Sequence, residues 1–279
     1  MGVYFRAKKA QLEMLRDRGF SLSAAPFLAN LWQQNQVHML STAGQPIPAD
    51  MQPTQEDLLQ LAPYYSISVI DETPLLNLNR TDMTNLYTAN GQTQFLPASL
   101  NQLYFKINEA GEVEACLVYY DNSQEGKAFG VEAVGPFLAY LDRVRQQISS
   151  WLKEVIIVIN NSKLTTSDAG SSSRLQKVTY CNITIFQADE IAINPKKHIF
   201  APEIYKLNQE EKMEHLAGKA RSQLPTYRYS DFKSAKAFHD PLVKYYGYQV
   251  TDLIRIEREV FYAPTIIHRE VSYRVVQQF

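Results

Sequence analysis

Apolar residues recur at helical spacing in two long segments of the chain. Leu12 and Leu15 share one face of residues 4–18, and Gly19 follows as a stop signal, which predicts a first helix. A longer helix is predicted from Pro136, placed in its first turn, to Lys153. Its apolar positions, which repeat every three or four residues, are Phe137, Leu141, Val144, Ile148 and Trp151.

Shorter segments have the pattern of strands. Residues 103–107 and 113–120 are rich in β-branched and aromatic residues and flank Asn108-Glu109-Ala110-Gly111, which predicts a hairpin. Val155–Ile159 is continuously apolar, as is typical of a strand buried on both faces of a parallel sheet. Residues 178–186 form another β-rich run. This alternation of strands with a helix predicts an α/β layer for the first part of the chain.

Cap and turn residues mark the segments between these elements. Residues 41–53 contain four turn formers and predict a loop, and Asn90-Gly91 predicts a turn. Thr54 to Asp57 resembles a helix cap, and Pro63 predicts the end of the helix that follows. Residues 66–70 alternate between apolar and polar side chains and predict a strand.

The pattern changes around Asn194-Pro195. Asn208 and Glu211 form a cap pair for a short helix that extends to about Ala217. Three later segments, 244–248, 253–257 and 271–276, are expected to be short strands or turns of a small α+β domain. The sequence therefore predicts two domains, an α/β domain over residues 1–193 and an α+β domain over residues 194–279.

Composition and charge fit a globular protein without a general affinity for nucleic acid. Apolar residues make up 45% and charged residues 20% of the 279 residues, and the formal net charge is −1. The first domain carries fourteen basic and nineteen acidic residues, whereas the second carries fourteen basic and ten acidic residues. This contrast suits two domains with different contacts, but ordinary solvated surfaces would explain it as well.

Signals for metals, cofactors and membranes are missing from the sequence. Cys116 and Cys181 lie in apolar runs, which predicts buried free thiols in a reducing compartment. The five histidines are scattered, so neither a metal site nor a cofactor is expected. The longest apolar stretches are far shorter than the roughly 20 residues that a membrane span needs, and we expect a soluble, intracellular protein without membrane contact.

No catalytic motif is visible, although one pair of acidic residues is suggestive. Glu112 and Glu114 alternate on a predicted strand, so both carboxylates would point to one face and could flank a metal, as in a nuclease. No lysine follows them at the spacing that a nuclease requires, and a solvated hairpin edge is the alternative interpretation. His198 could be a ligand or a packing residue, and the seventeen tyrosines could stack on bases or fill the core.

The C-terminal third resembles the fifth-subunit family of eukaryotic DNA-directed RNA polymerases, which also has an archaeal counterpart. The resemblance covers about eighty residues in an ordered series of short motifs. In chain order these are His198-Ile199-Phe200-Ala201-Pro202-Glu203, Leu224-Pro225, Asp240-Pro241, Tyr246-Gly247, Asp252-Leu253-Ile254-Arg255-Ile256-Glu257-Arg258 and Val271-Ser272-Tyr273-Arg274-Val275-Val276. More loosely, residues 12–20, 53–54 and 69–74 resemble the N-terminal domain of eukaryotic members.

The sequence departs from the pattern of the family at several places. Ile204 stands where the opening motif has a second histidine, and Thr251 stands where the turn before the arginine-containing strand has glycine. Residues 75–100, 163–177 and 232–239 are expanded. These departures point to a divergent eukaryotic member or one encoded by a large DNA virus.

The resemblance implies a non-catalytic subunit shared by RNA polymerases I, II and III, with two functional parts. The C-terminal domain would be an assembly module on the largest subunit, and the N-terminal domain, restriction-endonuclease-like but non-catalytic, would form part of the jaw near downstream duplex DNA. The resemblance implies assembly or domain-defining roles for His198, Pro202, Leu224, Pro225, Asp240, Pro241, Gly247, Arg258, Tyr273 and Arg274.

Physical chemistry suggests what some of these residues do, and each of them could equally hold the small domain together without touching a partner. Gly247 is expected to permit a backbone conformation that other residues resist. Arg258 and Arg274 are suited to bidentate pairing, and Tyr273 offers an apolar face with a polar tip.

Contact with DNA is expected to be slight, because the N-terminal domain is acidic. It would use basic residues of the first helix, Lys8, Lys9, Arg16 and Arg18.

The location implied is the nucleus, or a virion or cytoplasmic viral factory for a virus-encoded chain. Two other functions remain open: a nuclease-like enzyme on the N-terminal domain, and an adaptor that docks regulators on the polymerase.

Overall fold

The chain folds into two compact units, Met1–Ile193 and Asn194–Phe279, and the division falls where the sequence pattern changes. The computed structural model describes the residues 2–44, 52–65, 67, 71–88, 96–122, 129–148, 150–160, 174–175, 177–216, 224–229, 240–262 and 265–278. Each unit has its own four-stranded sheet.

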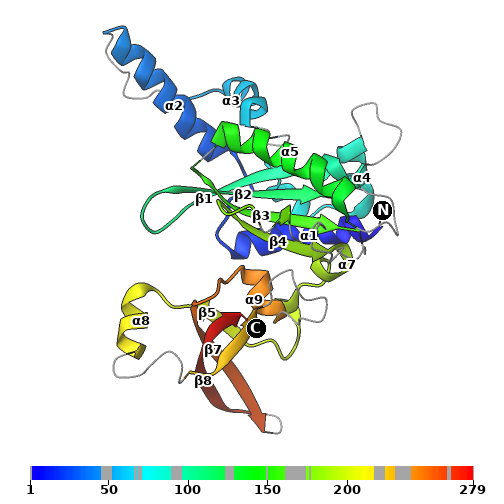
Figure 1. Cartoon of the computed structure of the whole chain (residues 1–279), viewed down its shortest axis with the longest axis vertical. Helices are drawn as coiled ribbons and strands as arrows, with labels where there is room; N and C mark the ends of the chain where they lie inside the picture. Colours follow the sequence, from blue (N-terminus) through cyan, green and yellow to red (C-terminus); the bar gives the residue numbers. More distant parts are fainter. Residues whose placement is uncertain are drawn as a thin grey trace. The chain divides into compact units, whose positions relative to one another are not determined.

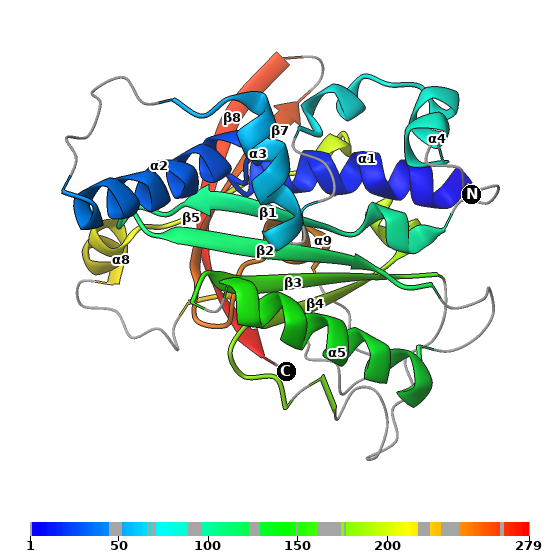
Figure 2. The same cartoon turned by 90° about the horizontal axis from the view of Figure 1, so that it is seen from above.

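The sheet of the first unit has the strand order β1-β2-β3-β4 (Figure 2). β1 (Gln102–Ile107) and β2 (Val113–Tyr120) form the predicted antiparallel hairpin. β3 (Leu152–Ile159) and β4 (Asn182–Gln187) continue the sheet in parallel, as the continuous apolar run of β3 predicted. Parallel strands need a long crossover, and between β2 and β3 that crossover contains helix α5 (Val131–Ile148).

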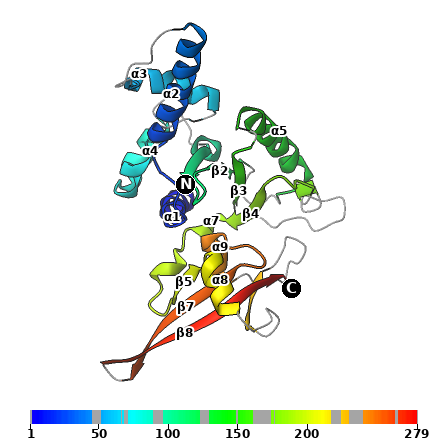
Figure 3. The same cartoon turned by 90° about the vertical axis from the view of Figure 1, so that its left-hand side faces the viewer.

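Helices α1 (Gly2–Asp17) and α5 cover opposite faces of this sheet (Figure 3). Adjacent side chains on a strand point to opposite faces. Tyr119 of β2 packs edge-on against Phe137 of α5, whereas Tyr120 packs against Tyr4 of α1. The mixed sheet with helices on both faces is an α/β arrangement, as predicted.

The remaining helices of the first unit lie around this sheet and its two covering helices. They are α2 (Ala25–Thr42), α3 (Gln55–Leu61), α4 (Arg80–Thr88), α7 (Ala188–Ile191) and the 3₁₀ turns η1 (Ala62–Tyr65), η2 (Thr73–Leu76) and η3 (Pro97–Leu100). The predicted cap of α3 is confirmed, because the Thr54 hydroxyl accepts from the Asp57 N–H while the Asp57 carboxylate accepts from the Thr54 N–H. None of the helices that the structure describes is long and apolar enough to cross a membrane.

Three predicted boundaries in the first unit are wrong. Helix α5 begins at Val131, five residues before Pro136, and ends at Ile148 rather than Lys153. A backbone bond from Trp151 N–H to Ile148 O (2.8 Å) closes a turn there, and β3 starts immediately after it. The region predicted as a loop from residue 41 is instead helical up to Thr42, because α2 spans eighteen residues that the apolar pattern did not reveal.

Several predictions fall on residues that the structure does not describe. The strand at 66–70 is described only at Ile67, and the Asn90-Gly91 turn lies outside the described residues. The expanded segment 232–239 also lies outside them, as does most of 163–177. The expanded segment 75–100 is described except for 89–95 and contains α4 and η3.

The sheet of the second unit has the strand order β5-β7-β8-β6 (Figure 1). The strands are β5 (Glu203–Lys206), β6 (Thr226–Tyr229), β7 (Leu253–Tyr262) and β8 (Thr265–Gln278). β8 pairs antiparallel with β7 and parallel with β6. Helix α8 (Gln209–Leu216) begins at the predicted cap, where the Asn208 and Glu211 side chains each accept the other's backbone N–H (2.9 and 2.8 Å).

The segment 244–248, predicted as a strand or turn, is helical. Helix α9 spans Pro241–Tyr246, and its side chains Leu242 and Val243 join a buried cluster with Ile204, Ile254 and Ile256 of the sheet. The helix-capping residues Asp240, Pro241 and Gly247 outweigh the β propensity of its tyrosines.

Candidate functional site

An exposed apolar pair marks the start of the second unit. Ile199 and Phe200 are 85% and 82% exposed and follow the 3₁₀ turn η4 (Pro195–Lys197). A backbone bond from Ala201 N–H to His198 O (2.8 Å) folds the segment, and the His198 Nδ1 accepts from the Phe200 N–H (3.2 Å). Two adjacent large apolar side chains in water are costly, so such a pair is a candidate contact surface. We call residues 198–202 the anchor segment.

A row of side chains crosses the sheet immediately after the anchor segment. In the strand register, Tyr205 of β5 is opposite Arg255 of β7, which is opposite Tyr273 of β8. The neighbouring residues Ile204 and Ile256 pack under α9, so the row lies on the other face of the sheet. We call this face, which α9 does not cover, the outer face.

Charged side chains form a ladder on the same outer face. Arg255 pairs with Glu257, and Arg269 reaches both Glu257 (3.5 Å) and Glu259 (3.6 Å). A hydrogen bond from the Tyr205 hydroxyl to the Glu203 carboxylate raises the pKa of Tyr205. The ladder is partly exposed, so it fixes side-chain positions and contributes little stability of its own.

Helix α8 packs against Tyr273. Its ring is 4.0 Å, between centroids, from the His215 ring in the last turn of α8. Tyr273 is half-buried, and Met213 of the same helix is exposed. The outer face therefore combines aromatic surface, paired charges and one helix.

Asp240, Pro241 and Gly247 build helix α9. The Asp240 carboxylate accepts from the backbone N–H groups of Leu242 (2.9 Å) and Val243 (3.3 Å), and Pro241 occupies the first helical position. Gly247 ends the helix with φ +69°, in the left-handed region, and so adopts the conformation expected of it.

The turn after α9 contains a second residue with positive φ. Thr251 has φ +80°, and its N–H donates to Val276 O (2.8 Å). A β-branched residue rarely adopts this conformation. Thr251 is the position at which the resemblance expects glycine, so the substitution retains the turn at the expense of backbone strain.

The other predicted residues of the second unit differ in their exposure. Pro202 and Leu224 are half-buried, Pro225 is exposed, and the Pro225 carbonyl accepts from Val275 N–H (3.0 Å). Arg274 is half-buried and Arg258 is exposed. These two arginines lie in the register with Ile254 and Glu270, on the α9 side of the sheet, so the structure does not bring them together with Tyr273.

Two of the four basic residues predicted for DNA contact are unsuitable, and this part of the prediction is wrong. Lys8 is fully buried: its ammonium lies 3.0 Å from the Glu72 carboxylate and donates to the Tyr104 hydroxyl (2.7 Å). Burial lowers the pKa of Lys8, and the neighbouring Glu72 carboxylate opposes that shift. The Arg18 side chain is also buried and pairs with Glu154 of β3.

The other two basic residues have a different environment. Arg16 is exposed, and Lys9 is half-buried. Of the four predicted side chains, only these two reach solvent, and Arg6 of the same helix is also exposed.

The acidic pair of the hairpin is held by neighbouring donors. The Asn108 amide donates to both Glu112 (3.2 Å) and Glu114 (3.1 Å), and Lys106 pairs with Glu114 (3.3 Å). Partial burial opposes ionisation of Glu114, but the Asn108 bond and the Lys106 charge lower its pKa overall. Among the described residues, no cluster of three His, Cys, Asp or Glu side chains is placed to hold a metal.

Exposure is the property that sequence reasoning missed at the anchor segment. Ile199 and Phe200 were visible as part of a motif, but apolar residues beside a strand are usually buried, so the pattern alone did not mark them as a surface. Their position after the polar run Lys196-Lys197-His198 was the available signal. No protein-family model matches this sequence, and no curated protein is significantly similar to it.

Proposed function

We propose that this chain is a non-catalytic subunit of a multi-subunit DNA-directed RNA polymerase and that its second unit docks on the largest subunit. The observation that carries the docking proposal is the exposed pair Ile199 and Phe200, which lies inside the first motif of the resemblance. The polymerase assignment itself rests on the ordered motifs of residues 198–276.

The anchor segment and the outer face have the chemistry of a protein interface. Interfaces that bind tightly have apolar or aromatic anchors at the centre and polar groups around them. Phe200 and Ile199 would be the anchors, and the Arg255, Glu257 and Arg269 ladder of the outer face would supply oriented charges. Burying each anchor would contribute about 1.5–3 kcal/mol.

The first unit would form part of the jaw near downstream DNA. With Lys8 and Arg18 buried, its contact with duplex DNA would be weak and limited to exposed groups such as Arg16. The same proposal places the protein in the nucleus, or in a virion or viral factory if a virus encodes it.

The test is affinity purification of the tagged full-length chain at high salt from the cells that produce it, with quantitative mass spectrometry. The expected result is the two large catalytic subunits and the small core subunits in amounts nearly equal to the tagged chain. Recovery of the chain alone or with unrelated proteins would overturn the polymerase assignment. Recovery of polymerase in small, salt-sensitive amounts would favour the adaptor hypothesis.

A double variant then tests the docking surface. Ile199→Ser with Phe200→Ser should reduce recovery of the largest subunit at least tenfold, because both apolar anchors are lost. The matched control is Tyr64→Ser, which removes a side chain that is 72% exposed in the first unit and should leave recovery unchanged. Full recovery with the double variant would place the docking surface elsewhere and leave the polymerase assignment intact.

A further inference from the structure

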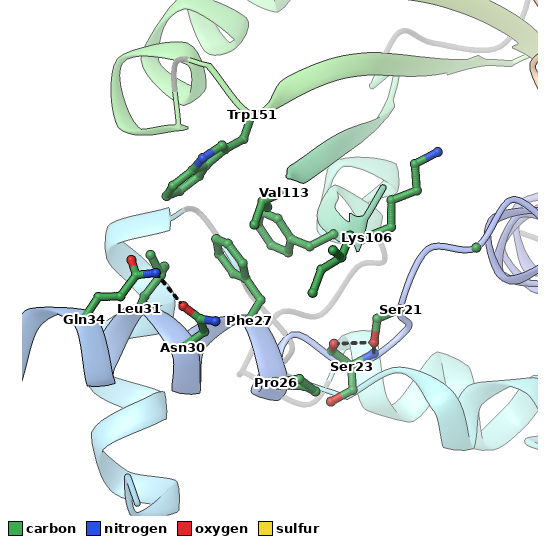
Figure 4. Close-up of a pocket in the computed structure, with 13 residues that line it drawn as sticks. Ser21, Ser23, Pro26, Phe27, Asn30, Leu31, Gln34, Lys106, Val113 and Trp151 are labelled. Carbon is green, nitrogen blue, oxygen red and sulfur yellow. Dashed lines mark hydrogen bonds between the residues drawn. The ribbon is translucent and has the colours of Figure 1, made fainter. Parts of the chain in front are cut away.

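A cavity of about 320 Å³ opens in the first unit between α2, the β1–β2 hairpin and the turn before β3 (Figure 4). Its walls are mainly aromatic and aliphatic. The Phe27 ring stacks on Phe105 (centroids 3.7 Å apart, planes at 10°) and meets Trp151 edge-on (5.4 Å, 89°). Leu31 and Val113 add aliphatic surface to the lining. A cavity of this volume is at the small end of the range for sites that bind small molecules.

The walls belong to backbone that is held in place without a ligand. Trp151 lies in a turn closed by its own N–H bond to Ile148 O (2.8 Å), and its carbonyl accepts from Ala115 N–H of β2. Phe105 is in the middle of the registered hairpin, and the backbone N–H of Ser21 donates to its carbonyl (2.9 Å). The rings are therefore preformed, which reduces the entropy lost on binding.

The electrostatics of the cavity favour an uncharged ligand. Of the described residues that line it, Lys106 alone is charged, and its side chain extends away from Phe27 and Trp151 (Figure 4). Its ammonium lies 3.3 Å from the Glu114 carboxylate and 4.5 Å from the centre of the Phe20 ring. An anion would find no counter-ion against the aromatic walls and would lose its hydration without compensation, whereas a cation would regain only part of its hydration energy from the ring faces.

The mouth of the cavity offers one donor and one acceptor, at the two ends of a hydrogen-bonded amide pair (Figure 4). Asn30 and Gln34 are one turn apart on α2, and the Gln34 Nε2 donates to the Asn30 Oδ1 (2.7 Å). Within the described part of the chain, this bond leaves the Asn30 Nδ2 as a donor and the Gln34 Oε1 as an acceptor. A ligand edge that carries both an acceptor and a donor could bond to either end of this pair.

We propose that this cavity binds an uncharged planar heteroaromatic molecule of one or two fused rings, with a hydrogen-bond donor and acceptor on one edge. The ring meets one of the nearly perpendicular rings of Phe27 and Trp151 face-on and the other edge-on, and its polar edge faces Asn30 and Gln34 at the mouth. Aromatic walls select a flat ring, the lack of an available counter-ion selects a neutral one, and the amide pair selects the substituted edge.

The probes that test this proposal are 7-azaindole, which has both edge groups, and indole, which has the same shape but only the donor. Binding is followed by two-dimensional ¹H–¹⁵N NMR of the full chain, which has two tryptophans, Trp32 and Trp151. Trp32→Phe assigns the remaining side-chain indole signal to Trp151. We expect a saturable shift of the Trp151 signal, with 7-azaindole binding about fivefold more tightly than indole.

Three variants and one charged analogue separate the proposed site from non-specific binding. Phe27→Ala should weaken both probes about tenfold by removing the central ring, and Ile107→Phe, at an exposed position on the rim, should close the mouth with little effect on the core. Asn30→Leu should abolish the preference for 7-azaindole while indole still binds, because it removes the donor that only the acceptor nitrogen of 7-azaindole can use. Indole-3-acetate, an anion of similar shape, should bind at least tenfold more weakly.

Other results would overturn the proposal. These are shifts that do not saturate, equal binding of the anion, or unchanged affinity in both Phe27→Ala and Ile107→Phe. The proposed polymerase role depends on the second unit, whereas the cavity lies in the first. The outcome of the ligand-binding test and that of the purification test are therefore independent.

Discussion

Replacing Thr251 by glycine should stabilise the second unit, although it removes a side chain. Thr251 has φ +80°, where the Cβ atom of an L-residue crowds the backbone. That conformation costs about 1–2 kcal/mol for a residue with a Cβ atom. Glycine avoids the clash but loses about 0.5–1 kcal/mol more conformational entropy on folding. The two effects leave a net stabilisation of about 0.5–1 kcal/mol.

Nothing else at the position should offset this gain. Thr251 is exposed, so little packing is lost, and the bond from its N–H to Val276 O is made by the backbone and survives the substitution. The matched control is Thr251→Ala, which removes the branched side chain but keeps the Cβ atom. This variant should be little more stable than the wild type, because the crowding comes from the Cβ atom itself.

The assay must report on the second unit, and both tryptophans are in the first. We would measure hydrogen–deuterium exchange by mass spectrometry on peptides covering β7 and β8, together with scanning calorimetry. Exchange in those strands should slow about two- to fivefold in Thr251→Gly relative to wild type. If Thr251→Gly were no more stable than Thr251→Ala, the inference of strain at this turn would be refuted.

Two further predictions concern the core of the first unit. Lys8→Met should lower the free energy of unfolding by about 3–5 kcal/mol, because Glu72 is left buried without its cation. The double variant Lys8→Met with Glu72→Leu should recover much of that loss. Urea unfolding followed by tryptophan fluorescence measures both variants, and equal stability of the two would contradict the argument. Burial raises the pKa of the Cys116 thiol from 9.0 to about 12, so the folded state keeps a proton that the unfolded state releases, and stability is lost as pH rises above 9.0. Between about pH 8 and about pH 10 the thiol accounts for about 1.4 kcal/mol of this loss. In the same unfolding assay, the free energy of unfolding of Cys116→Ala should therefore fall by that much less over this pH range. An equal fall in the wild type and the variant would argue against a buried, protonated thiol.

The sequence predicted the sheets better than the helices. The hairpin and the buried strand β3 followed directly from alternation and from the continuous apolar run. Helix α2 was missed because its second half, beginning Trp32-Gln33-Gln34-Asn35-Gln36, has few apolar positions to set a period. Helix α9 was missed because it is short and its tyrosines favour strands, although Asp240, Pro241 and Gly247 are the signals that define it.

The candidate site was predictable in its parts but not in its arrangement. The first helix shows why: Lys8 was taken as a surface charge, yet it is four residues before Leu12 and seven before Leu15, on the buried face. Its partner, Glu72, is 64 residues away, so only the tertiary structure reveals the pair. Similarly, strand register places Tyr273 and Arg274 on opposite faces, which a motif written in one dimension cannot show.

The strand order of the second unit has a consequence for the timing of its folding during synthesis. β8 lies between β7 and β6, so β6 has no neighbour in the sheet until residues 275–278 have left the ribosome. At translation rates of about 5–20 residues per second, β6 waits for several seconds after it emerges. During this interval its backbone groups can pair with other nascent strands, so this unit depends on folding factors or an early binding partner more than the first unit does.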